Sequence, residues 1–352
     1  INSYRDLPLL YNQWCTIVRW EKTTRPFLRS REILWQEGHT MHPSKEDAMN
    51  ETLKMLKVYE DFQKNILAIP VFTGRKTDKE KFAGAEETYS IEAMMYDGVA
   101  LQNATSHYFG TGFAKAFDIK FLNKENKYEF PYQTSWGCTT RMIGSLVMVH
   151  GDDRGLVLPP RIAPYKVVII PIGEDENVTN ALDKITEDLK DSLVTFKIDN
   201  TNKTPGFKFA EAEVKGYPIR LEIGKRDLAN GYVTLVRRDT LEKIQVSVDD
   251  AAIKINELLI NIQNDMYEKA KERRDSMLYE AKNYEEMTEL SKKPGFIYTN
   301  WCGNVDCENK IKDDLGLKSR CIPFDNNEPD GNKKCVCCGN DATTKIYWAK
   351  QY

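Results

Sequence analysis

Two pairs of cysteines near the end of the chain have a spacing that suits a metal ion. They are Cys302-x4-Cys307 and Cys335-x2-Cys338, and Gly339 after the second pair allows a tight turn with backbone amides near sulfur. Four thiolates around a tetrahedral zinc ion are the expected arrangement, with Cys337 as an alternative to Cys338 for the fourth ligand. Because sulfur would fill all four positions and leave none for water, the zinc would stabilise the fold.

The most informative stretches for catalysis are rich in arginine. The first contains Val18-Arg-Trp-Glu21 and continues from Arg25 to His39; the second runs from Thr134 through Arg141 to Arg161. They resemble motif 2 and the prolyl-specific form of motif 3 in class II aminoacyl-tRNA synthetases. From about residue 5 to the final tyrosine, the chain is similar to the prolyl-tRNA synthetase family.

This resemblance implies activation of L-proline by ATP, which brings two anions together. Arginine suits such a site because its planar, permanently charged fork donates paired hydrogen bonds to phosphate or carboxylate. Arg19 would hold the α-phosphate and the substrate carboxylate, while Arg29 and Arg141 would hold the distal phosphates. Magnesium would arrive with ATP. Arg19 and Arg141 are the predicted catalytic residues, and the predicted ATP-binding set is Arg19, Glu21, Arg29, Ser30, Ile33, Gln102, Thr105, Thr139 and Arg141.

The resemblance also implies a pocket for a small apolar ring with a protonated secondary amine. Trp35 and Phe82 would supply apolar walls, and Glu37, His39 and His107 would supply polar partners. In the family, Ser106 belongs to the same lining run as Gln102 and His107. The predicted proline-binding set is Arg19, Trp35, Glu37, His39, Phe82, His107, Ser135, Trp136 and Gly137.

The segment between His39 and Thr134 is accounted for by one helix and pocket elements, so it leaves no room for the inserted editing domain of the bacterial type. Together with the cysteine module, this favours the eukaryote-like or archaeal-like form of the family. A later run, Pro205 to Asp227, resembles the anticodon-binding domain. A mixture of Glu, Lys and Arg suits the edges of unstacked bases, and Lys208, Glu213 and Arg226 are the predicted contacts.

The chain also departs from the family pattern. Relatives carry a segment before the position of Ile1, with motif 1 at the dimer interface and an amine-binding loop, so we expect the chain to lack its N-terminal part. Ile33 stands where relatives usually place a phenylalanine against adenine, and Ala212 where a tryptophan is common. These departures motivate an alternative hypothesis, a non-catalytic tRNA-binding or regulatory relative.

The secondary-structure pattern predicts how these residues are positioned. Residues 1–164 combine short β-rich runs with one helix from Ser44 to about Ile66, which favours a largely antiparallel sheet. Residues 165–264 alternate apolar strands with helices, as in an α/β domain. Residues 249–291 are rich in Glu and Lys and are interpreted as a solvated helical connector. The fold prediction is an α+β catalytic domain (1–164), an α/β anticodon-binding domain (165–264), and a helical connector with a small α/β zinc-binding domain (265–352).

Composition limits the remaining possibilities. The chain has 352 residues, 41% of them hydrophobic and 29% charged, with a formal net charge of −3. That charge argues against a non-specific polyanion binder, and no run approaches the roughly 20 apolar residues of a membrane span. Together with this composition, the family resemblance implies a cytoplasmic enzyme whose partners are ATP, L-proline and tRNA(Pro). The family resemblance adds the expectation of a homodimer.

Overall fold

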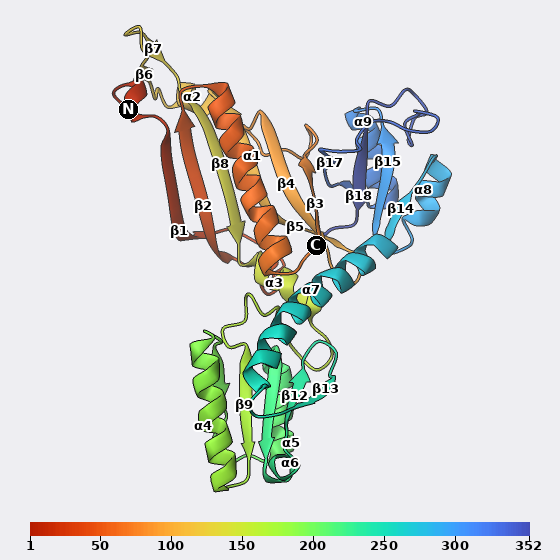
Figure 1. Cartoon of the computed structure of the whole chain (residues 1–352). Helices are drawn as coiled ribbons and strands as arrows, with labels where there is room; N and C mark the ends of the chain where they lie inside the picture. The colour runs from red at the N-terminus through yellow and green to blue at the C-terminus, as the bar shows by residue number, and fades with distance from the viewer. The chain divides into compact units, whose positions relative to one another are not determined.

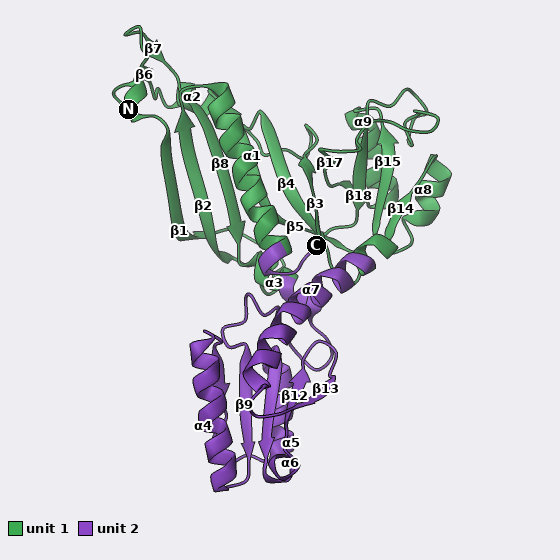
Figure 2. Ribbon diagram, viewed as in Figure 1, with its two compact units in different colours: residues 1–64, 70–145, 273–352 green, residues 65–69, 146–272 purple.

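The computed structural model describes residues 1–352, which form two compact units (Figure 2). Unit 1 contains residues 1–64, 70–145 and 273–352, and unit 2 contains residues 65–69 and 146–272. The predicted motifs 2 and 3 and the cysteine knuckles fall in unit 1, apart from the end of motif 3. No helix combines the length and the apolar character needed to cross a bilayer.

A seven-stranded sheet forms the centre of unit 1. Every neighbouring pair of strands in it is antiparallel, as the strand-rich sequence without crossover helices predicted. In spatial order the strands are β1 (Leu9–Val18), β2 (Glu32–His42), β8 (Tyr132–Thr139), β5 (Ala100–Gly110), β4 (Glu87–Met94), β3 (Val71–Arg75) and β17 (Ile322–Pro323).

One helix covers one face of this sheet (Figure 1). Helix α1 (Lys45–Asp61) begins at Ser44, whose hydroxyl accepts the Asp47 amide, and continues as a π-helical segment, η2 (Phe62–Ile66). Its buried face includes Ala48 and Leu56. The predicted helix from Ser44 to about Ile66 is therefore confirmed. The smaller elements of this region are η1 (Tyr4–Asp6), α2 (Gly112–Ala116), β6 (Phe121–Leu122), β7 (Tyr128–Glu129) and α3 (Arg141–His150).

Unit 2 is built on a five-stranded mixed sheet, as the alternation of apolar strands and helices predicted. Strands β10 and β11 both pair with β9 in parallel, whereas β12 and β13 continue the sheet in antiparallel. Val167 and Ile169 face the larger core, and Val168 and Ile170 face a smaller one. The elements are β9 (Val167–Ile172), α4 (Glu176–Asp191), β10 (Phe196–Ile198), α5 (Pro205–Lys215), β11 (Ile219–Gly224), α6 (Lys225–Ala229), β12 (Val233–Arg237) and β13 (Lys243–Val246).

The interpretation of residues 249–291 as a solvated connector is wrong. Helix α7 (Ala251–Ser276) buries Ile255, Leu258 and Ile262 in the larger core of unit 2. The helix ends at Ser276, and a short strand, β14 (Leu278–Glu280), pairs in parallel with β15 (Phe296–Trp301). The sequence analysis overlooked this apolar stripe because many Glu and Lys residues occupy the other faces of the same helix.

Residues 277–352, here called the C-terminal module, form a second sheet in unit 1. Its order is β14-β15-β18-β16, and strand β17 leaves it to pair with β3 of the large sheet. The last residue, Tyr352, lies against the large sheet: its amide donates to the Ala100 carbonyl and its ring lies under the Arg25 guanidinium. The other elements are α8 (Tyr284–Leu290), α9 (Val305–Leu315), β16 (Lys318–Ser319) and β18 (Thr344–Ala349).

A paired carboxylate in unit 2 predicts a pH-dependent contribution to stability. Asp152 accepts two hydrogen bonds from the buried Arg238 guanidinium, at 2.8 and 2.6 Å, which lowers the pKa of Asp152 to about 2. Since the folded pKa is depressed, the stabilisation is complete above the ordinary carboxyl range and is lost as pH falls toward 2. Solvent reaches the Asp152 side chain, so we expect about 1 to 2 kcal/mol at neutral pH.

Asp152→Asn should therefore lower the thermal midpoint of unit 2 at pH 7, and the difference from wild type should narrow as pH falls from about 4 to about 2. Thermal unfolding measured over this pH range checks the sign. The exposed neighbour Asp153, replaced by Asn, is the matched control and should leave the midpoint unchanged. A difference for Asp152→Asn that is independent of pH would contradict the assignment.

Candidate active site

A cavity of about 670 Å³ opens on the face of the large sheet that α1 does not cover. Its size falls within the usual range for small-molecule sites. Thr105 and His107 point into it from β5, while the hydroxyl of Ser106, between them, donates to the Thr52 carbonyl of α1. The predicted residues that line the cavity are Arg19, Ser30, Ile33, Trp35, Glu37, His39, Phe82, Gln102, Thr105, His107, Ser135, Trp136, Gly137, Thr139 and Arg141.

Ser106 is the exception within the run that the family resemblance assigned to this lining. It is fully buried on the opposite face of the sheet. The reason is the alternation of side chains along a strand, which sends neighbours to opposite faces.

A β-bulge explains how Gln102 and Thr105 share one face. Residues three apart on a regular strand point to opposite sides. Here Ile91 pairs with Ala104 but Glu92 pairs with Gln102, so Asn103 is the extra residue in β5. The amide of the Asn103 side chain donates to Gln63 and Ser145. The bulge thus turns Gln102 toward the cavity that also receives Thr105.

One end of the cavity gathers positive charge. Arg141 is held by backbone carbonyls: its Nε and Nη2 donate to the Leu28 oxygen at 3.3 and 3.2 Å, and its Nη1 donates to the Gln102 oxygen at 3.2 Å. Burial, together with the positive charges of Arg29 and Arg19, lowers the pKa of Arg141. The guanidinium has no carboxylate partner, so an anion in this end of the cavity would relieve the repulsion.

Two predicted nucleotide ligands do not line the cavity. Arg29 and Glu21 lie on the loop between β1 and β2 and form an ion pair with each other, at 3.6 Å. Arg29 is still close enough to act electrostatically on Arg141. Their contact with a nucleotide stays a prediction.

The other end of the cavity combines aromatic walls with a few polar groups. The rings of Phe82 and His107 lie with centroids 5.0 Å apart, and His39 Nε2 lies 3.0 Å from a Glu37 carboxylate oxygen. Thr88 contacts Nδ1 of His107 at 2.9 Å. Burial lowers the pKa of His107 to about 4, which makes this imidazole neutral at pH 7. A neutral ring beside a carboxylate favours a cationic ligand more than a charged imidazolium would.

Gly38, on the face of β2 toward α1, is a position behind the cavity that the sequence analysis missed. A β-carbon at this position would lie 2.1 to 2.3 Å from atoms of the Trp136 ring. The absence of a side chain on β2 therefore lets the indole of β8 lie across its neighbour strand on the face toward α1, since Trp136 pairs with Gly38 and with Ser106. The only signal was a glycine within a strand of large residues.

Further lining residues were missed because their pattern resembles an exposed turn. Lys76 and Glu80 belong to the charged run Lys-Thr-Asp-Lys-Glu-Lys, and Thr88 lies on β4 between Glu87 and Tyr89. Charge runs are typical of solvated segments, yet Lys76 is buried. Alternation with Ser90 and Glu92 on β4 was the available signal for Thr88.

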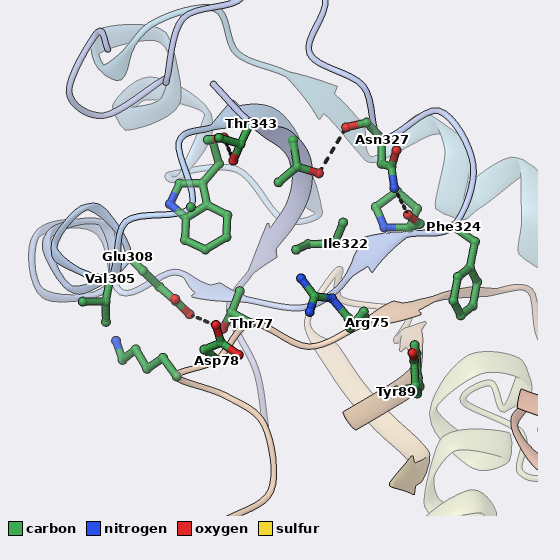
Figure 3. Close-up of a pocket in the computed structure, with 15 residues that line it drawn as sticks. Arg75, Thr77, Asp78, Tyr89, Val305, Glu308, Ile322, Phe324, Asn327 and Thr343 are labelled. Carbon is green, nitrogen blue, oxygen red and sulfur yellow. Dashed lines mark hydrogen bonds between the residues drawn. The ribbon is translucent and has the colours of Figure 1, made fainter. Parts of the chain in front are cut away.

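A second cavity, of about 560 Å³, lies between β3, β4 and the C-terminal module (Figure 3). Arg75, Tyr89 and Phe324 are among its lining residues. None of the predicted ATP or proline ligands lines it. The predicted ligands therefore come together at the first cavity and not at the second.

The predicted anticodon ligands differ in how available their charges are. The ammonium of Lys208 is buried and donates to the Asp199 carbonyl at 2.9 Å. Glu213 is ion-paired with Arg154 and Arg220. Arg226 is exposed on α6 with no ion pair. RNA contact by these three residues stays a prediction.

The sulfur atoms of Cys302, Cys307, Cys335 and Cys338 lie within 4.8 Å of one another. Two of the separations are 3.7 and 3.8 Å, between Cys302 and its neighbours Cys307 and Cys338. Zinc–sulfur bonds of about 2.3 Å in a tetrahedron place sulfurs roughly 3.8 Å apart, so the donor set fits zinc. Cys337 is not part of this group of four.

Three families of known proteins match successive parts of the chain. Residues 1–150 match the class II core domain of tRNA synthetases (G, H, P, S and T), residues 166–258 match the anticodon-binding domain, and residues 284–352 match the C-terminal domain of prolyl-tRNA synthetase.

Curated relatives match over the whole length of the chain. Proline--tRNA ligase of Lachnoclostridium phytofermentans is 54% identical, and the alignment covers 100% of this chain and 73% of the relative. The ligase of Clostridium novyi is 53% identical with 100% and 73% covered, and proline--tRNA ligase 2 of Bacillus cereus is 52% identical with 100% and 74% covered. These relatives are bacterial. The predicted eukaryote-like or archaeal-like form therefore refers to the arrangement of domains and not to the kind of organism. On this likeness over its full length, together with the three matched domains, the chain belongs to the prolyl-tRNA synthetase family.

Proposed function

We propose that this chain activates L-proline with ATP to form prolyl-adenylate and transfers the prolyl group to tRNA(Pro). The observation that supports the proposal most directly is the division of one cavity into two ends. Arg19 and Arg141 supply uncompensated positive charge at one end, and Glu37 and His107 supply polar groups among aromatic rings at the other. No comparison favours the alternative of a non-catalytic relative.

In the first step the proline carboxylate attacks the α-phosphorus of ATP. A carboxylate–phosphorus bond forms, the bond to the β-phosphate oxygen breaks, and pyrophosphate leaves with its electron pair. No general base is needed, because the carboxylate is already ionised. Arg19 would contact both the α-phosphate and the carboxylate, and Arg29 and Arg141 the distal phosphates. Catalysis would then rest on positioning and charge complementarity. Magnesium bound with ATP neutralises part of the phosphate charge.

The aromatic end of the cavity would hold the proline ring. Trp35 and Phe82 offer apolar surface, β8 lines the cavity at Trp136, and Glu37 offers a carboxylate to the protonated amine. Neutral His107 would avoid the repulsion that an imidazolium would exert on that amine. Transfer of the prolyl group would follow binding of the tRNA anticodon to unit 2, for which Lys208, Glu213 and Arg226 remain our proposed contacts.

We further propose a structural zinc ion on Cys302, Cys307, Cys335 and Cys338. All four ligands are sulfur, so the ion would hold β15 and α9 to the loop before β18 without taking part in the chemistry.

A homodimer in the cytoplasm is the proposed state of the protein. Support for an interface comes from the edge strand β1 and the residues that follow it. Trp14 is 81% exposed, Val18 80% and Trp20 87%, which is unusual for large apolar side chains.

Arg19→Ala should lower the rate of proline-dependent ATP–pyrophosphate exchange by about 10²- to 10³-fold. The physical reason is loss of a charge-assisted contact in the transition state, by analogy with about 2.7 to 4 kcal/mol for one oxyanion donor. Arg31, on the same loop, stacks on Trp20 and does not line the cavity, so Arg31→Ala is the matched control. An unchanged exchange rate for Arg19→Ala would remove Arg19 from the proposed role.

Gly38→Ala should raise the proline KM and spare ATP affinity. A methyl group at this position displaces the Trp136 ring behind the strands that carry Glu37 and Ser135, and a misplacement of about 1 Å in a substrate site costs up to about 10²-fold in kcat/KM. The control is Gly112→Ala, because a β-carbon there meets nothing within 4 Å. Equal effects on the KM values of proline and ATP would show that Gly38 does not shape the proline end specifically.

Metal analysis of the purified protein should give about one zinc per chain, and Cys302→Ser should reduce that content. Cys337→Ser is the matched control and should retain the metal, since Cys338 belongs to the converging group. Loss of zinc from Cys337→Ser with retention by Cys338→Ser would reverse the assignment of the fourth ligand. Absence of metal from protein prepared without chelators would refute the site.

A further inference from the structure

A buried cluster of charges joins the C-terminal module to the large sheet. Glu92 of β4 is 0% exposed, and Arg320, between β16 and β17, is 2% exposed. Nε and Nη2 of Arg320 donate to one Glu92 oxygen at 3.0 and 2.5 Å. Lys76 donates to the other Glu92 oxygen at 3.2 Å and to the Arg320 carbonyl at 2.7 Å. The cluster therefore contains two cations and one anion, held by charge-assisted hydrogen bonds.

The cluster lies beside the active-site cavity. Lys76 itself lines that cavity. Glu92 pairs with Gln102 across β4 and β5, directly at the bulge that turns Gln102 toward the cavity. Because paired residues of antiparallel strands point to the same face, the Glu92 carboxylate and the Gln102 side chain share the cavity face of the sheet. The partner of Glu92 on that face comes from the C-terminal module.

Two contacts extend from this point to the proposed nucleotide site. The Gln102 carbonyl accepts a hydrogen bond from Nη1 of Arg141 at 3.2 Å. The charges of Glu92 and Arg320 also act on the Arg141 guanidinium, in opposite directions. Without the Arg320 charge, Lys76 would be the only cation bonded to the Glu92 carboxylate. The backbone of β5 at Gln102, whose carbonyl accepts from Arg141, would then be held less firmly.

A neighbouring contact fixes the same segment to helix α9. The Thr77 hydroxyl donates to a Glu308 carboxylate oxygen at 3.0 Å (Figure 3), and Ser319 donates to the same oxygen. Glu308 is 2% exposed and Thr77 is also 2% exposed. Lys76 and Thr77 are therefore both held by the C-terminal module, and the segment they begin continues to Glu80 and Phe82 in the cavity wall.

We propose that Arg320 is a positioning residue for ATP, which acts through Glu92 and the bulge at Gln102 to hold Arg141 in place. This inference rests on the proposed function, and it deepens it by assigning the C-terminal module a part in nucleotide binding. Gln102 and Arg141 lie at the ATP end of the cavity, whereas the cluster reaches Phe82 only through the segment that Lys76 begins, so we expect the larger effect on ATP.

The test measures ATP–pyrophosphate exchange with the full-length protein, varying ATP and proline separately. Arg320→Met should raise the ATP KM by about tenfold or more and change the proline KM by less than about threefold. Arg320→Lys keeps the charge but not the fork, so it should restore part of the lost ATP affinity. Arg320→Met combined with Glu92→Gln should be less impaired than the sum of the single variants, because the buried group that loses the Arg320 fork is then neutral.

The matched control is Lys345→Met. Lys345 is buried to a similar degree in the C-terminal module, but its partners Glu280 and Asp330 lie within that module. This variant should leave the ATP KM unchanged. Equal shifts of the ATP and proline KM values, or the same ATP shift in Lys345→Met, would overturn the inference. Wild-type protein without proline-dependent exchange would instead refute the proposed function itself.

Discussion

The arrangement of the active site depends on positive charge that has no fixed counterion. Arg19 and Arg141 line one end of the cavity, and Arg29 is close enough to oppose the charge of Arg141. Such a group of cations would disperse if each side chain were free to rotate. Arg141 is prevented from doing so by carbonyls of Leu28 and Gln102, which are neutral and leave its charge uncompensated. A polyanion bound among these guanidiniums would relieve their mutual repulsion.

Holding Arg141 in this way requires the fold to place two backbone carbonyls accurately. The Leu28 carbonyl belongs to the loop between β1 and β2, whereas the Gln102 carbonyl belongs to β5, so one side chain joins two distant parts of the fold. The ladder from β1 to β8 fixes the loop, and the bulge at Asn103 fixes the other acceptor. A bulge is suited to this task because it re-aims a side chain without interrupting the rest of the sheet.

The sequence predicted the antiparallel sheet, helix α1 and about half of the cavity lining, since strand alternation and recognisable motifs are local properties. It failed where a position is set by distant contacts. Lys76 looked solvated because its partners, Glu92 and Arg320, come from far along the chain. Ser106 was assigned to the cavity although alternation turns it to α1. Helix α7 looked exposed because its apolar stripe is narrow and its core partners are in unit 2.

The buried Glu92 cluster raises the question of why charges are used where apolar side chains would pack. A buried ion pair gives little net stability over hydrophobic residues of similar volume, because desolvation offsets the attraction. Its advantage is direction: the Arg320 fork, Lys76 and Ser90 together define where the Glu92 carboxylate lies. An apolar contact would allow the C-terminal module to slide along β4, whereas these hydrogen bonds fix its register. Since Arg141 is bonded to the next strand at the same level, a fixed register here also fixes its guanidinium, our proposed nucleotide ligand.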